Sequence, residues 1–398
     1  MLVSINISPY VLCGAALALA ASLFWFYKTF FNSTSTTLAN VPLLTKWPDL
    51  PPGWWTDSER FQTEKRAIFS QTWICVSHRS RFVKAGDYIA FDIAGFRVLL
   101  MLGKDGTVRA FHNICRHRAF PVAKKASGSS SVLGCRYHGW SYDTKGQLTK
   151  APYFDNVPGF EKSQNGLFPI HTRVDDGGFL HINMSASEPA GDELSQMKKN
   201  SQLASISQSS HFLDSWEVQG NFNWKVIAND TQHTFQTPVT NGISRLFSDK
   251  DSVSTGQQRL GPLTTVSPTP SSPIWYQVTF SPDSVGQTTV RCDVYSTKKS
   301  DAHAFDSSAK ASLEDQIQAM VHQHEGIYTK LTGPDFDALG GGYEQSKIAD
   351  MVDAHLEKEK LQGQDIKPAT IQQCRSAAYM QAEGICRAME CGSKKLDW

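Results

Sequence analysis

Two short stretches of the chain, 17 residues apart, each carry one cysteine and one histidine. The first is Cys115-x-His117 and the second is Cys135-x-x-His138. Thiolate sulfur and imidazole nitrogen both bind iron, and in one type of [2Fe–2S] cluster two cysteines bind one iron while two histidines bind the other. Each stretch would then present one ligand of each kind. The spacing predicts such a cluster, with these four residues as its ligands.

The same residue types also make structural zinc sites, so a zinc-binding module is an alternative. A zinc finger normally has two or more residues between paired ligands. Cys115 and His117 are separated by a single residue. The spacing therefore favours the iron–sulfur cluster over zinc.

The sequences around these ligands resemble the Rieske non-haem iron oxygenases, in particular the α-subunits of choline monooxygenase-like and ring-hydroxylating enzymes. The resemblance runs over most of the chain after residue 50. It is carried by WWTD at 54–57, EKRAIFSQTW at 64–73, GDY at 86–88, AFHNICRHRA at 110–119 and CRYHGWSY at 135–142.

This resemblance implies a Rieske domain followed by a helix-grip catalytic domain. It also implies electrons arriving from an NAD(P)H-dependent reductase or a ferredoxin, passing through the cluster to a mononuclear iron in a neighbouring subunit. The assembly implied is a trimer, either a homotrimer or a heterotrimer.

A mononuclear oxygenase iron needs two histidines and one carboxylate, with positions left open for dioxygen and substrate. The resemblance places this site after an Asn-Trp-Lys motif, which is present at 223–225. The spacing of the family then leads to His233, Gln236 and Asn241, so amides stand where both histidines are expected. A histidine also stands where the carboxylate that bridges cluster and iron is expected. Amides are poor iron ligands, and the usual centre is not expected to form.

Asp315 is the predicted third ligand, because it opens a predicted helix where the family has an acidic ligand. An altered Fe(II) site made of His233, Asp315 and either His322 or His324 is an alternative to an absent one. Asp230 and His233 also repeat an Asp-x-x-His spacing. No catalytic residue is predicted.

The N-terminus is apolar. Residues 10–27 are an unbroken run of apolar or small residues, and the first charged side chain is Lys28. Eighteen residues can span a bilayer, and the aromatic residues at 24–27 suit its interface. We predict a single-pass membrane anchor that leaves the large domain in the cytosol, at the endoplasmic reticulum. A cleaved signal peptide is the alternative. Two features argue against it: no basic residue precedes the apolar run, and the run is longer than the apolar region of a usual signal peptide.

These features predict four segments: an anchor at 1–31, a polar linker at 32–46, the Rieske domain at 47–185 and a catalytic-type domain at 186–398. Short β-type runs at 87–92, 97–102, 108–112 and 178–184 predict an all-β first domain. The second domain is predicted as α+β, an antiparallel sheet with helices. Its strands are expected at 275–280 and 288–295, and its helices at 216–237, 309–330 and 348–389, the last broken at Pro368.

Composition excludes some partners. Lysine and arginine number 39 against 38 aspartate and glutamate, so no electrostatic field favours nucleic acid. The eight cysteines do not form the dense array of a disulfide-stapled secreted module. A lipophilic small-molecule substrate is the expected partner.

Two functions follow. The first is a membrane-anchored Rieske oxygenase that oxidises a lipophilic small molecule in secondary metabolism. The second is a degenerate subunit that relays electrons or assembles with an active paralogue, which the replaced iron ligands favour. The number of irons per chain separates the two.

Overall fold

The computed structural model describes most of the chain after residue 49. The described residues are 50, 53–155, 157, 160–189, 206, 210–229, 258–268, 272–300, 305–333, 343–368 and 377–392. All of them belong to one compact unit, Trp47–Trp398.

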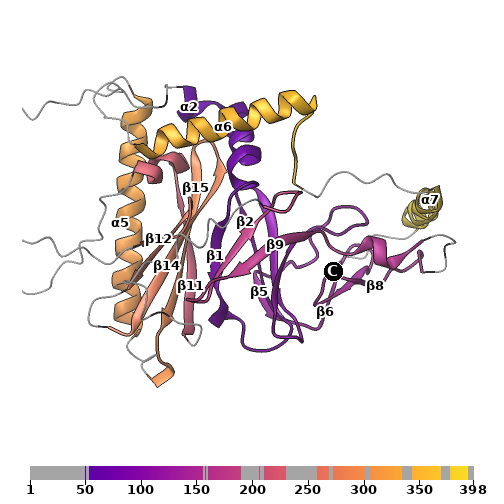
Figure 1. Ribbon diagram of the computed structural model, residues 1–398. Coiled ribbons are helices and arrows are strands. Elements are labelled where there is room, and N and C mark those ends of the chain that lie inside the picture. Colours follow the sequence, from indigo (N-terminus) through magenta and orange to yellow (C-terminus); the bar gives the residue numbers. More distant parts are fainter. Residues whose placement is uncertain are drawn as a thin grey trace, which may run out of the picture. The chain divides into compact units, whose positions relative to one another are not determined.

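The first part of this unit is built from two antiparallel sheets (Figure 1). The larger has seven strands in the order β1-β10-β9-β4-β3-β2-β5, and the smaller has three in the order β6-β7-β8. The strands predicted at 87–92, 97–102 and 108–112 are present as β2, β3 and β4. The bounds are β1 Ile74–His78, β2 Asp87–Ile93, β3 Phe96–Leu102, β4 Val108–His112, β5 Ser127–Ser129, β6 Val132–Gly134, β7 Ser141–Asp143, β8 Leu148–Lys150, β9 Pro169–Val174 and β10 Phe179–Asn183.

The second part has a five-stranded antiparallel sheet in the order β11-β15-β14-β13-β12. The long helix α5 runs along this sheet (Figure 1). The bounds are β11 His211–Gly220, β12 Gln258–Arg259, β13 Thr264–Pro268, β14 Ile274–Ser284, β15 Gln287–Ser296, α5 Ser307–Thr332, α6 Tyr343–Gln362 and α7 Ala377–Gly392. Shorter helical segments are α2 Gly53–Thr56, α3 Ser58–Glu64, η2 Lys65–Phe69, η3 Arg79–Arg81, η4 Lys162–Asn165 and η6 Trp224–Asn229.

One predicted helix is wrong. The spacing of apolar residues predicts a helix over 216–237, but residues 211–220 form β11 and only Trp224–Asn229 is helical, as a short 3-10 segment. β11 pairs with β15 from His211 to Gly220. The hydrogen-bonded partner strand decides the conformation here, because its pairing outweighs a local apolar pattern that also fits a helix. Residues 230–237 lie outside the described residues.

The later helices are close to expectation. The helix predicted at 309–330 is α5, and the predicted broken helix over 348–389 is seen as α6 and α7. The break comes earlier than Pro368, since α6 ends at Gln362 and Gly363 adopts a positive φ of 68°. Glycine tolerates this backbone region and commonly ends helices for that reason.

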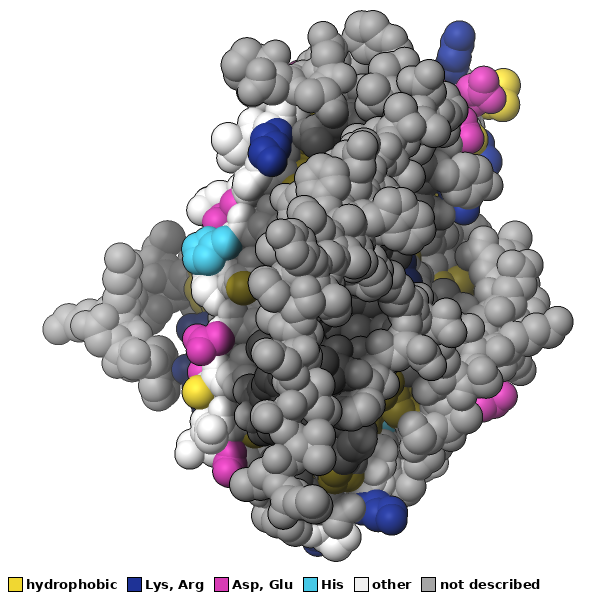
Figure 2. All heavy atoms as spheres, turned by 90° about the vertical axis from the view of Figure 1, so that its left-hand side faces the viewer, with side chains coloured by type: hydrophobic (Ala, Val, Ile, Leu, Met, Phe, Trp, Pro, Cys, Tyr) yellow, Lys and Arg dark blue, Asp and Glu magenta, His cyan; other side chains and the backbone are white. Residues whose placement is uncertain are grey.

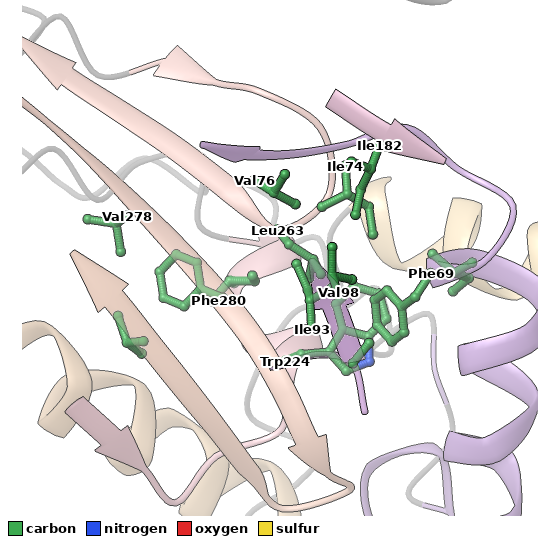
Figure 3. Close-up of a cluster of buried hydrophobic side chains, with 14 of the residues drawn as sticks. Phe69, Ile74, Val76, Ile93, Val98, Ile182, Trp224, Leu263, Val278 and Phe280 are labelled. Atoms are coloured by element: carbon green, nitrogen blue, oxygen red, sulfur yellow. The ribbon is translucent and has the colours of Figure 1, made fainter. Parts of the chain in front are cut away.

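The two β parts share a hydrophobic core (Figure 3). Ile74 and Ile182 from the seven-stranded sheet belong to the same buried cluster as Leu263, Val278 and Phe280 from the five-stranded sheet region. Burying each such side chain contributes about 1.5–3 kcal/mol. The shared core therefore binds the two sheets into one unit.

Two predictions are not tested by this fold. The predicted anchor and linker, residues 1–46, lie outside the described residues. Among the helices that are described, none combines the length and hydrophobicity needed to cross a bilayer. The predicted boundary at residue 185 stays a prediction: β10 ends at Asn183, β11 begins at His211, and most residues between 190 and 209 are not described.

Candidate iron–sulfur site

Two loops with the same backbone geometry present the predicted ligands. One follows β4 and the other connects β6 to β7. In the first, the backbone N–H of Cys115 donates to the carbonyl of Phe120 at 2.8 Å, and in the second, that of Cys135 donates to the carbonyl of Trp140 at 2.8 Å. The donor and acceptor are five residues apart in both loops, so each cysteine occupies the same place in its loop.

The residue four positions after each cysteine closes the turn. Ala119 donates its N–H to the carbonyl of Cys115 at 2.9 Å, and Gly139 does the same to Cys135 at 2.9 Å. Both have a positive φ, 58° at Ala119 and 74° at Gly139. Positive φ is ordinary for glycine but uncommon for alanine, and backbone strain of this kind is concentrated at functional sites.

The thiols of Cys115 and Cys135 are buried and hydrogen-bonded to each other. That hydrogen bond lowers the pKa of Cys135 to about 6 and raises the pKa of Cys115, whose burial acts in the same direction. The hydroxyl oxygen of Tyr142 lies 3.3 Å from the Cys115 sulfur. The same oxygen accepts the backbone N–H of Arg116 at 3.0 Å, and toward a thiolate, which can only accept, the hydroxyl would donate its own O–H.

The two imidazoles form the second pair. The ring centroids of His117 and His138 are 4.4 Å apart, and His117 stacks on Trp140 with 8° between the ring planes. Burial, aided by the neighbouring His138, lowers the pKa of His117 to about 4, so this ring is neutral at physiological pH. Neutral imidazole is the form that binds a metal.

The arrangement fits a [2Fe–2S] cluster bound by two thiolates and two imidazoles. Thiol lies beside thiol and imidazole beside imidazole, as required when each pair binds its own iron. Within the part of the chain that the structure describes, no three His, Cys, Asp or Glu side chains converge as they would around a single metal ion. The four predicted ligands lie in the structure as a thiol pair and an imidazole pair.

Further hydrogen bonds hold the first loop. The buried side chain of Asn113 accepts the backbone N–H groups of Val122 and Ala123 at 3.0 and 2.9 Å and donates to the carbonyl of Ala123 at 2.8 Å. The guanidinium of Arg116 donates to the carbonyl of Gly166 at 2.7 Å. These contacts fix the loop from both sides.

Glu383 is a site residue that the sequence did not reveal. It lies on α7, and its carboxylate Oε2 is 2.8 Å from Nε2 of His117. The two residues are 266 positions apart. A lone glutamate in a predicted helix carries no local sign of such a contact, so only the tertiary structure could find it.

The Asn-Trp-Lys motif has a structural role. Lys225 Nζ lies 2.7 Å from Oε1 of Glu64, and Trp224 Nε1 donates to the other carboxylate oxygen at 2.7 Å. Asn223 donates to the backbone carbonyl of Trp55 at 3.2 Å. Glu64 and Lys225 are both fully buried, so the motif ties η6 to α2 and α3.

Most of the predicted mononuclear iron site lies outside the described residues. His233 lies outside the described residues, as do Asp230, Gln236 and Asn241. Asp315 is exposed on α5. Figure 2 shows one face of the molecule, on which acidic, basic and histidine side chains are visible. This site stays a prediction.

The two histidines that were alternative ligands, His322 and His324, lie in different surroundings. His322 is exposed and its Nδ1 lies 3.1 Å from Oε2 of Glu325. His324 is buried against Phe222 and Phe280, and burial lowers its pKa to about 4. Apolar rings around it are typical of a core histidine.

Comparison with known proteins identifies the first part. Residues 72–161 match the family described as Rieske [2Fe-2S] domain. The carnitine monooxygenase oxygenase subunit of Acinetobacter pittii is 31% identical over 183 residues, which are 45% of this chain and 49% of that protein. The glycine betaine monooxygenase oxygenase subunit of Chromohalobacter salexigens is 33% identical over 144 residues, 36% of this chain and 32% of that protein. The matched region thus spans half or less of these relatives.

Among solved structures, the quaternary ammonium Rieske monooxygenase CntA in complex with L-carnitine has a similar fold, with a TM-score of 0.60. It is 21% identical to this chain, and the match covers 78% of this chain and 98% of CntA. The similarity includes the second part of the chain, with its mixed sheet and helices. Residues 72–161 therefore match the Rieske [2Fe-2S] domain, and the chain as a whole has a fold similar to that of CntA.

Proposed function

We propose that this chain is the oxygenase subunit of a Rieske oxygenase, which receives electrons from an NAD(P)H-dependent reductase or a ferredoxin and oxidises a small molecule. The observation that carries the proposal is the pair of equivalent loops that set thiol beside thiol and imidazole beside imidazole. When bound, the cluster would take up and pass on single electrons.

The residues of the chain would hold the cluster in an asymmetric setting. The thiols are deeply buried, whereas His138 is only partly buried and its neighbour Tyr137 is half exposed. Tyr137 lies against His138 with ring centroids 3.9 Å apart. Electrons would therefore pass through the imidazole edge, since it is nearer to the surface and to a docked partner.

The substrate is proposed as a lipophilic small molecule of secondary metabolism, which the apolar run at 10–27 supports. The same run supports a single-pass anchor in the endoplasmic reticulum membrane, with the rest of the chain in the cytosol. Two of the relatives are named for carnitine and glycine betaine, so quaternary ammonium compounds belong among the substrates to be tested. A trimeric assembly is proposed from the family resemblance.

A degenerate subunit is the second candidate. Gln236 and Asn241 stand where the family resemblance expects histidines, and amides bind iron weakly. On this alternative the cluster relays electrons, or stabilises a heterotrimer, while an active paralogue supplies the mononuclear iron.

Iron, zinc and acid-labile sulfide per chain, measured on anaerobically purified protein, test both candidates. About three irons with two sulfides would support an independent oxygenase, and about two irons with two sulfides a degenerate subunit. Cys135→Ser should lose the cluster, whereas Cys292→Ser, a matched change at a buried cysteine away from the site, should keep it. Zinc without sulfide would contradict the proposal.

A further inference from the structure

Two adjacent residues of the helix α7, Ala382 and Glu383, contact the region of the cluster loops. Ala382 is fully buried in the hydrophobic cluster that contains Cys115, Cys135 and Trp140. Glu383 is 2% exposed, although the neighbouring Ile385 is 43% exposed. The helix lies beside the three-stranded sheet (Figure 1), and among the side chains of α7 that the structure describes, these two are buried against the site.

The carboxylate of Glu383 is shared between two residues of the first loop. Its Oε2 lies 2.8 Å from Nε2 of His117, and its Oε1 accepts a hydrogen bond from Nε of Arg118 at 2.7 Å. A second guanidinium, that of Arg387 on the same helix, lies 3.5 Å from Oε1 and is largely exposed. The carboxylate is thus held between the cluster ligand and a guanidinium.

This geometry determines which nitrogen of His117 would face the iron. A carboxylate accepts hydrogen bonds, so Nε2 carries the proton and donates to Glu383, and Nδ1 is left to bind the metal. Partners of this kind fix the tautomer and orientation of a ligating histidine and increase its basicity.

Burying a carboxylate is costly unless it is paired and hydrogen-bonded. Glu383 meets both conditions only while α7 stays against the first loop, because His117 and Arg118 lie on that loop. The contact therefore couples the position of a C-terminal helix to the electronic state of a cluster ligand.

We propose that Glu383 is a positioning residue of the Rieske centre, which orients His117, lowers the reduction potential of the cluster and holds α7 over its imidazole edge. The inference rests on the [2Fe–2S] cluster of the proposed function. Its direction follows from charge: an anion next to the ligand favours the oxidised cluster, which carries the more positive irons.

The test is the reduction potential of full-length, cluster-loaded protein, measured by redox titration at one pH. Glu383→Gln removes the charge and keeps an acceptor oxygen. It should shift the equilibrium between the two cluster states about tenfold toward the reduced one, which is about 59 mV for one electron. Glu383→Asp should fall between the variant and the wild type, because it restores the charge on a shorter side chain.

Two further variants separate the cluster contact from general effects. Glu357→Gln makes the same charge change at an exposed position of α6 and should leave the potential unchanged. Ala382→Gln enlarges the buried contact without changing charge; it should displace the helix, raise the potential and speed hydrogen exchange of the amides at 377–392.

A Glu383→Gln protein with two irons, two sulfides and the wild-type potential would overturn the inference while leaving the proposed function intact. A wild-type protein without the cluster would instead overturn the proposed function, and the inference with it. If Glu383→Gln does not retain the cluster, the Ala382→Gln variant tests the proposal instead. An Ala382→Gln protein with the wild-type reduction potential and unchanged hydrogen exchange at 377–392 would rule the proposal out.

Discussion

Tyr142 illustrates how single side chains tune the site. It is fully buried, its hydroxyl oxygen accepts the N–H of Arg116, and the hydroxyl lies 3.3 Å from the sulfur of Cys115, to which it would donate when that sulfur is a thiolate. Burial, together with the nearby Cys115, raises the pKa of Tyr142, so the phenol keeps its proton. A hydrogen bond to a cluster sulfur stabilises the electron-rich reduced state, since that state carries more negative charge on sulfur.

Tyr142→Phe should therefore lower the reduction potential by tens of millivolts, because one hydrogen bond contributes about 1 kcal/mol. Redox titration of the loaded protein checks this. Tyr153→Phe, at an exposed tyrosine, is the control and should have no effect. An unchanged potential in Tyr142→Phe would show that the hydroxyl does not act on the sulfur.

His78 makes stability depend on pH. It is fully buried, its Nε2 donates to the carbonyl of Gly177 at 2.9 Å and its Nδ1 accepts the backbone N–H of Ser80 at 3.2 Å. This pattern requires the neutral ring. Burial lowers the pKa of His78 from 6.5 to about 4, so the folded state binds its proton less readily than the unfolded chain does.

Since the folded pKa lies below the unfolded one, the contribution of His78 is complete above pH 6.5 and is lost as pH falls toward 4. Between pH 7 and pH 5 the free energy of unfolding should drop by about 2 kcal/mol from this residue. Urea denaturation at both pH values checks this. His78→Gln should show a smaller drop, whereas His322→Gln, at an exposed histidine, should match the wild type.

Between elements, the buried ion pair of Glu64 and Lys225 connects α3 to η6. The two charges are 2.7 Å apart and fully buried. Burial lowers the pKa of Lys225, and Glu64 opposes this. Each charge depends on the other, so the pair specifies how the N-terminal helices lie on the second part of the chain.

Lys225→Met should lower the free energy of unfolding by about 3–5 kcal/mol, because it leaves a buried carboxylate without a counter-charge. Glu64→Gln combined with Lys225→Met should recover part of this loss, since glutamine still accepts the hydrogen bond of Trp224. Lys358→Met, at an exposed lysine of α6, should change little. A double variant no more stable than Lys225→Met would contradict the role of the unpaired charge. Urea denaturation measures all three.

At the scale of the whole molecule, the shared core predicts cooperative unfolding. Leu263 is fully buried in the cluster that joins the two sheets (Figure 3). Leu263→Ala should cost about 2–5 kcal/mol. The variant should also lose cluster absorbance and far-ultraviolet circular dichroism at a lower denaturant concentration, and both midpoints should decrease by the same amount. Two separate transitions would show that the parts unfold independently.

Much of the site could be predicted because it is local. Each loop contributes a cysteine and a histidine within four residues, and the turn that presents them closes within the same loop. The alternation of apolar residues likewise predicted β2, β3 and β4, and the length of the apolar pattern predicted α5. These features can be predicted from short-range spacing, because the residue types of the ligands and the backbone turns that present them are both determined by residues close together in the chain.

Long-range contacts decided the rest. β11 is a strand because β15 pairs with it, which the apolar spacing of residues 216–220 does not encode. The Asn-Trp-Lys motif can be recognised in the sequence, but its structural role depends on Glu64, which is about 160 residues away in the chain.

The sequence by itself predicted the four cluster ligands, the two-part α+β organisation and amides at 236 and 241, where the family resemblance expects iron ligands. The tertiary structure decided what surrounds those ligands, above all Glu383, which comes from 266 residues away. The physical reason is that a ligand set is fixed by residue type and spacing along the chain. The hydrogen bonds and charges around it depend instead on which distant elements pack there.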